Sequence, residues 1–187
     1  MVIDKYCKIF AVNMSTGDFY SEDEGFFLHA CSFGILPFLQ GYKLECQKLG
    51  CGKEHIESID ILISRVRIYQ GAMVPSGLLL IDRKYRFLAV PKSNGRVSDE
   101  KDGVYFSAAD KAVLNSLQAI KAERDMRWPS HDWLGLVEGL MERIEVFQRD
   151  RRSKIPDTSL PPEVERRIAD KGLEQACASD CARMTND

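Results

Sequence analysis

The pattern of apolar and polar residues predicts that residues 21–71 fold as two helical segments packed against each other. Ser21 followed by Glu24 matches a capping box, in which the hydroxyl and the carboxylate accept bonds from exposed N–H groups at a helix start. Pro37 predicts a kink or a restart, because proline removes a backbone donor. Gly50 then predicts the end of the second segment, since glycine readily takes the left-handed conformation that closes a helix.

After this glycine, apolar residues from Ile56 to Tyr69 recur at steps of three and four, which is typical of a helix with one buried face. The alternative is a strand, because the isoleucines over residues 59–63 alternate and are β-branched. That alternation slips at Ser64, whereas the helical spacing stays in phase throughout. The helix is therefore favoured.

Short strands are predicted on both sides of this helical stretch. Residues 6–12 are rich in aromatic and β-branched side chains. Residues 78–81 and 85–90 are apolar runs separated by the polar residues 82–84, which predicts a β-hairpin with a short turn. Residues 104–106 form either one more strand or the entry to a helix.

A second pair of helices is predicted over residues 107–149. Ser107 and Asp110 resemble a helix N-cap, and the first helix extends to about Arg127. In the second helix, apolar residues at steps of four and three form a heptad-like seam: Trp133, Val137, Leu140, Ile144 and Phe147. Such a seam packs either against the core of the chain or against a partner.

These elements predict an α+β fold that is predominantly helical, with a helical hairpin (about 21–71) and a helix pair (about 107–149) packed on a small antiparallel β-sheet. We expect residues 1–149 to form a single globular domain. Residues 150–187 are first basic, then proline-rich, which predicts a linker followed by a C-terminal helix or tail. We find no internal repeat in the sequence.

Composition and charge narrow the class of protein. The chain has 187 residues and a formal net charge of −2, which argues against a generally basic nucleic-acid-binding protein. No apolar run is long enough to span a membrane, and Asp4 and Lys5 stand where a secretion signal needs apolar residues. The six cysteines are then most simply free thiols in a reducing compartment, so we expect a cytoplasmic protein.

The first candidate site is a cluster of cysteine and histidine residues. Cys46, Cys51 and His55 lie close together in the sequence, and either Cys31 or His29 on the facing segment supplies a fourth ligand for tetrahedral zinc. The alternative is that the thiols simply pack in the core, because buried free cysteine behaves as a small apolar residue. This second interpretation is favoured, so no cofactor is expected, with zinc as the alternative.

The second candidate site is the pair Asp82 and Lys84 after an apolar run. A metal-dependent nuclease would use such an acid to hold a divalent ion and the lysine to orient water, with Glu57 or Asp60 as a partner acid. Aspartate is also a favoured first residue of a turn, and this interpretation is preferred.

A third candidate is a basic surface for nucleic acid. If gathered on one face, seven cations would neutralise phosphates: Arg65, Arg67, Arg83, Lys84, Arg86, Arg151 and Arg152. Acidic residues are interleaved among them, so solvated side chains are favoured instead.

The function that the sequence favours is a non-catalytic binding or regulatory protein, adaptor-like or inhibitor-like, acting by protein–protein contact. Its predicted interface is the seam from Trp133 to Phe147, which would also serve a homodimer. The alternative is a nucleic-acid-associated protein, zinc-stabilised through the Cys46, Cys51 and His55 cluster. A metal-dependent enzyme using Asp82 comes third.

Overall fold

The computed structural model describes residues 2–71, 80–127 and 133–150. Within these ranges the chain forms six strands and four helices in the order β1 (Cys7–Asn13), β2 (Phe19–Ser21), β3 (Gly25–His29), α1 (Ile35–Lys48), α2 (Lys53–Gly71), β4 (Tyr85–Pro91), β5 (Ser98–Asp99), β6 (Gly103–Ser107), α3 (Lys111–Arg127) and α4 (Trp133–Asp150). None of these helices combines the length and the apolar content that crossing a membrane requires.

The strands form two antiparallel sheets. One has four strands in the order β2-β1-β4-β5, and the other is the pair β3-β6. Side chains alternate along β1 and β4, so that Ile9 and Phe87 point inward and Phe10 and Leu88 point outward. The inward side chains pack with Tyr105 in a small core between the two sheets.

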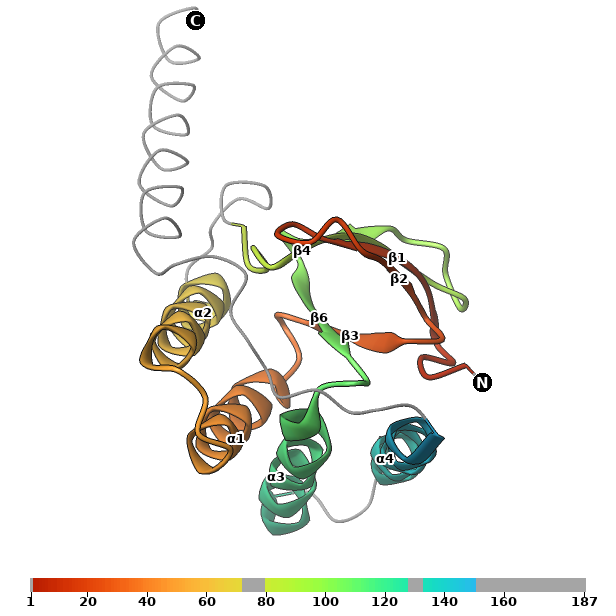
Figure 1. Cartoon of the computed structure of the whole chain (residues 1–187). Coiled ribbons are helices and arrows are strands. Elements are labelled where there is room, and N and C mark those ends of the chain that lie inside the picture. Colours follow the sequence, from red (N-terminus) through yellow and green to blue (C-terminus); the bar gives the residue numbers. More distant parts are fainter. Residues whose placement is uncertain (1, 72–79, 128–132, 151–187) are drawn as a thin grey trace, which may run out of the picture.

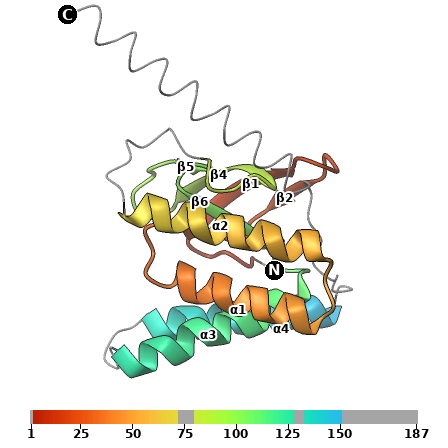
Figure 2. The ribbon, with the colours of Figure 1, turned by 90° about the vertical axis from the view of Figure 1, so that its left-hand side faces the viewer.

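The four helices lie in an arc on the side of the β3-β6 pair that faces away from the four-stranded sheet (Figure 1). Helices α1 and α3 occupy the middle of the arc and contact each other most extensively, whereas α2 and α4 lie at its ends. The larger hydrophobic core fills the space between the arc and the β3-β6 pair, with Phe26, Phe38 and Phe106 in mutual ring contact. Figure 2 shows the helices on one side of the molecule and the four-stranded sheet on the other.

The structure reveals an internal repeat that relates residues 3–71 to residues 81–149. Asp4 and Asp82, whose numbers differ by 78, are both buried just before the first strand of their half. Each half has the order strand, strand, strand, helix, helix. The expectation of no repeat was therefore wrong.

The hydrogen bonds obey the same offset of 78 residues. Asp4 N–H donates to Glu22 O and Asp82 N–H donates to Glu100 O, both at 2.9 Å. Ala30 N–H donates to Asp102 O and Ala108 N–H donates to Glu24 O, both at 2.7 Å. The side-chain amides of Gln70 and Gln148 donate to Ala30 O at 2.7 Å and to Ala108 O at 2.9 Å. The turns of the two halves contain Gly17 and Gly95, whose φ angles of 75° and 67° favour glycine.

An internal two-fold axis relates the two halves. In the register of β1 and β4, Phe10 lies opposite Leu88, and in the register of β3 and β6, Phe27 lies opposite Tyr105. Each of these residues faces its own counterpart in the other half. The axis therefore passes through the centre of both strand pairs.

The halves also exchange contacts, so neither is a separate folding unit. Strand β3 pairs with β6 of the other half, and Arg65 on α2 donates to the carbonyl of Leu80 at 3.3 Å. In the reverse direction, Arg143 on α4 donates to the carbonyl of Ile3 at 2.8 Å. Both halves contribute to the larger core.

Several elements agree with the sequence. The α+β class is confirmed, as are the strand near residues 6–12 and the helix over the stripe from Ile56 to Tyr69. Residues 104–106 belong to strand β6. Both helices of the second predicted pair are present as α3 and α4.

Other elements differ. The fold is not predominantly helical, because the first part of the predicted hairpin over 21–71 is a turn followed by β3. Phe26 and Phe27 there pair with β6 instead of forming a helical face. Pro37 lies in the first turn of α1, where it displaces no hydrogen-bonded donor.

The predicted hairpin of 78–81 and 85–90 is also wrong. Ile81 and Asp82 donate to Glu100 O, and β4 pairs with β1 and β5. Residues 78–79 and the predicted tail over 151–187 lie outside the described residues.

Candidate functional site

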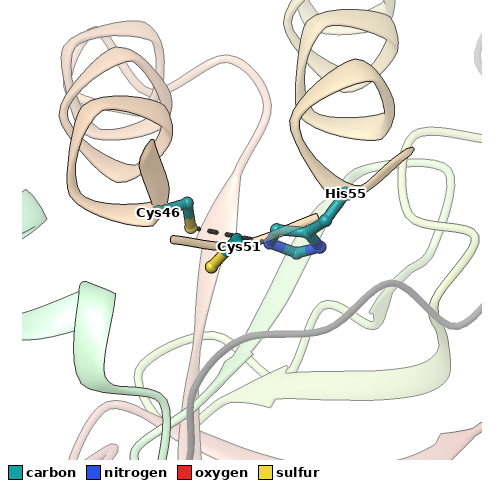
Figure 3. Close-up of side chains that lie close together, drawn as sticks. All are labelled: Cys46, Cys51 and His55. Carbon is teal, nitrogen blue, oxygen red and sulfur yellow. Dashed lines mark hydrogen bonds between the residues drawn. The ribbon is translucent and has the colours of Figure 1, made fainter. Parts of the chain in front are cut away.

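The Cys46, Cys51 and His55 cluster is assembled by the connection between α1 and α2. Cys46 lies in the last turns of α1, and the left-handed Gly50, with φ of 72°, turns the chain back. The Cys51 N–H then donates to the Cys46 carbonyl at 3.0 Å, which places Cys51 beside Cys46. His55 follows on the first turn of α2 and completes the group (Figure 3).

The geometry of the cluster fits a soft divalent metal ion. The three ligand atoms lie within 4.8 Å of one another, and Cys46 Sγ is 3.5 Å from His55 Nε2. Tetrahedral zinc bound at its usual Zn–S and Zn–N lengths separates sulfur from nitrogen by about 3.5 Å. The same distance also suits a thiol hydrogen bond to the imidazole, so measurement of bound metal must separate the two.

Burial governs the protonation of the Cys46 thiol. Cys46 and His55 are buried and Cys51 is half-buried. Burial raises the pKa of the Cys46 thiol, and the negative charge of Asp110 raises it further. Without metal, Cys46 is therefore a neutral thiol at pH 7, and a metal ion must displace its proton.

The predicted fourth ligand is not at the site. Cys31 precedes the start of α1 and is exposed, whereas Cys46 lies near the helix end. At the usual rise of 1.5 Å per residue, the start of α1 and Cys46 are about 16 Å apart along the helix. His29 lies at the same remote end, where its Nδ1 accepts the Cys31 N–H. Among the described residues the cluster has three members, so a bound metal takes its fourth ligand from water or from another part of the chain.

Tyr42 and Asp110 also lie near this cluster, a position that their sequence does not indicate. The Tyr42 hydroxyl donates to Asp110 Oδ2 at 2.5 Å, and its ring contacts His55 edge-on at 6.1 Å between centroids. Burial raises the pKa of Tyr42 strongly, and the Asp110 charge adds to the shift. Nothing in the local sequence connects residues 68 positions apart, so only the fold could reveal this pair.

The internal repeat shows that the cluster is confined to one half. The positions 78 residues after Cys46, Cys51 and His55 hold Arg124, Pro129 and Trp133. The general fold of the repeat therefore does not require these ligands.

Two cavities that the internal repeat relates to each other differ in the polarity of their linings. The cavity between α2 and the second half, about 80 Å³, is lined by polar groups that include Tyr42, His55 and Ser58. Its counterpart between α4 and the first half, about 170 Å³, has Ile120 and Leu136 where the first has Tyr42 and Ser58. The cavity beside the cluster is thus the more polar of the two.

The structure gives Asp82 a structural role. Its Oδ1 accepts the N–H groups of Lys84 and Tyr85 at 2.9 and 3.0 Å, and its Oδ2 accepts that of Tyr105 at 2.9 Å. The buried Asp4 holds three equivalent backbone donors. Because both oxygens of Asp82 bond to backbone donors and the repeat uses the arrangement twice, we assign Asp82 to the fold. The Lys84 ammonium lies over the Tyr85 ring at 5.7 Å.

The basic residues are divided between the interior and separate surface positions. Arg65 and Arg83 are buried, Arg67 is exposed, and Arg86 pairs with Glu100 at 3.8 Å. Arg151 and Arg152 lie outside the described residues. The described cations therefore do not form one continuous exposed surface.

The apolar seam on α4 faces the interior of this chain. Val137, Ile144 and Phe147 are buried in the larger core, and Leu140 is partly buried beside it. The Trp133 side chain lies outside the described part of the structure. The buried members of the seam are consequently not accessible to a partner.

An apolar surface that the sequence did not suggest lies on the outside of the four-stranded sheet. We define this outer face by three strand side chains with large exposed fractions, Phe10 (66 %), Phe19 (81 %) and Leu88 (51 %), together with Val97 (55 %), which is exposed just before β5. An open groove of about 650 Å³ crosses the face between Phe10, Phe19 and Leu88. Solvent-facing positions of an antiparallel sheet are ordinarily polar, so this face is exceptional.

No known protein family, curated protein or solved structure matches the chain.

Proposed function

We propose that the protein is a non-catalytic binding protein of the regulatory or adaptor kind, and that it acts by protein–protein contact through the outer face. The observation that carries the proposal is the grouping of the exposed Phe10, Phe19 and Leu88 around one groove on the sheet surface. Single exposed apolar residues are common on proteins, but a contiguous group around a groove is typical of interaction sites.

The amino-acid types at this surface support contact with a protein. Aromatic side chains bury a large apolar area and dominate the energetics of protein interfaces. Around them lie charged residues such as Arg86 and Glu100, which gives an apolar centre with a polar rim.

The experiment is capture from a nuclease-treated lysate of the native cell with the tagged full chain. Two carboxylates are introduced at the centre of the face by Phe10→Glu with Leu88→Glu, and Leu44→Glu on α1, 57 % exposed, is the matched control. We expect wild type and control to capture one protein near stoichiometry, and the double variant to lose it. Capture of the same proteins by all three would contradict the proposal.

A second proposal is that Cys46, Cys51 and His55 bind one zinc ion, which joins the end of α1 to the start of α2. The observation that favours it is the convergence of three ligand atoms within 4.8 Å. The separation of the described cations gives no comparable support to nucleic-acid binding, and Asp82 offers none to a metal-dependent enzyme.

Zinc content and thermal stability test the second proposal. Protein prepared with zinc supplied should hold about one equivalent, and Cys51→Ser or His55→Ala should lose it. Cys31→Ser, which removes an exposed thiol at the other end of α1, should retain it. Cobalt substitution should produce thiolate-to-metal absorption. Metal-free protein whose melting temperature does not change with chelator would refute the assignment.

A further inference from the structure

The internal two-fold symmetry extends to the outer face. Phe10 and Leu88 are counterparts, as are Phe19 and Val97, so all four exposed apolar residues form two symmetry-related pairs. Because Phe10 lies directly opposite Leu88 in the register, the axis emerges at the centre of the face.

The charged rim follows the same symmetry. Lys8 pairs with Glu22 at 2.5 Å, and their counterparts Arg86 and Glu100 pair at 3.8 Å. Since each ion pair contains both signs, it can meet another such pair without forcing like charges together. The face therefore consists of an apolar centre on the axis and two neutral charged pairs around it.

We propose that the outer face binds a second copy of this chain and forms a two-fold symmetric dimer. This inference rests on the proposed function, because it names the partner of the same surface. A symmetric dimer requires one patch to complement itself, and this face carries both a protruding side chain, Phe19, and a groove that can receive it. Face-to-face sheets pack about 10 Å apart, a distance that interdigitating side chains from both faces fill.

The shape of the face supplies the interdigitation. Phe19 projects from the edge strand β2 with 81 % of its surface exposed, and the groove beside it is lined by Phe10 and Leu88. In the dimer, the Phe19 ring of each copy enters the groove of the other. Both copies thereby cover the apolar residues that the isolated chain leaves in water.

The test is the molar mass of the full-length protein by light scattering and sedimentation. The chain of 21.2 kDa should give about 42 kDa as a dimer. Phe10→Glu with Leu88→Glu should weaken association at least about a hundredfold, because the introduced carboxylates would be buried without partners. Phe19→Asp should act in the same direction from the sheet edge, and Leu44→Glu should leave the dimer intact.

Circular dichroism and melting temperature establish that each variant is folded, which their exposed positions favour. A wild-type chain that stays monomeric up to about 100 µM, well above the Kd of a standard interface, overturns the inference. So does a dimer that both the Phe10 with Leu88 variant and the Phe19 variant retain. A monomer that captures a different protein through Phe10 and Leu88 overturns the inference while the proposed function stands.

Discussion

Replacing Asp4 with alanine tests whether the buried carboxylates organise the fold. Asp4 Oδ1 accepts the N–H groups of Tyr6 and Cys7, both at 2.9 Å, and Oδ2 accepts that of Phe27 at 3.2 Å. The last bond joins the start of the chain to β3, and Asp4 itself is 6 % exposed.

The magnitude follows from the three donors that alanine leaves behind. A buried donor without its partner costs about 1–3 kcal/mol. Water entering the space of the lost carboxylate offsets part of this, so we expect Asp4→Ala to lower the free energy of unfolding by about 3–5 kcal/mol at pH 7. That is a large fraction of the roughly 5–15 kcal/mol typical of a domain.

Urea unfolding followed by circular dichroism measures the effect. Asp4→Asn keeps one oxygen acceptor and should lose less than half as much as alanine. Asp60→Ala, which removes an exposed carboxylate paired with Lys43, should change the free energy by less than about 1 kcal/mol. A loss below about 1 kcal/mol in Asp4→Ala would refute the argument that the carboxylate holds these three backbone groups.

Three further predictions concern the core and its protonation. Gly103→Ala should lower the melting temperature clearly, because the new Cβ would overlap a carbonyl and an aromatic ring on β3. Gly17→Ala, at positive φ with open space around it, should lower the free energy of unfolding by only about 1 kcal/mol. Ile144→Ala should cost about 2–5 kcal/mol in urea unfolding, and Leu136→Ala on the same helix, 40 % exposed, much less; equal losses would contradict the inward orientation of the seam. Burial raises the pKa of Asp82 from 3.8 to about 6, although backbone donors oppose the shift. Between these pH values the folded state therefore binds more protons than the unfolded state. The stabilisation that this protonation gives is present below about pH 4 and is lost as pH rises through 6. The stability advantage of wild type over Asp82→Asn should therefore shrink from pH 4.5 to pH 7, and a constant difference would contradict this titration.

The helices that bury one continuous face could be predicted from the sequence. The stripe from Ile56 to Tyr69 and the seam on α4 both gave helices, because local periodicity determines which side faces the core. The turn before β3 could not be distinguished from a helix start, since Ser21, Glu24 and two phenylalanines satisfy a helix-start pattern equally well. Only the pairing of β3 with β6, more than 70 residues later, selects the strand.

The repeat escaped detection because its identities are scattered. The halves share short, scattered identities, such as Gly25 and Gly103 or Leu39 and Leu117, and many positions between them differ, such as Ile9 and Phe87. The proximity of Cys46, Cys51 and His55 could be predicted from their spacing, since one helix turn and one glycine bring them together. The predicted fourth ligand failed because the length of α1 separates Cys31 from Cys46.

The exchange of elements between halves has a consequence for synthesis on the ribosome. Strand β3 has its partner only when residues 103–107 have emerged, and Phe26 cannot complete its stacking until Phe106 is present. At about 5–20 residues per second, the 78 residues between equivalent positions take roughly 4–16 s to translate. During that interval the first half lacks the strand that pairs with β3, and such an unpaired strand with exposed apolar side chains is prone to aggregate.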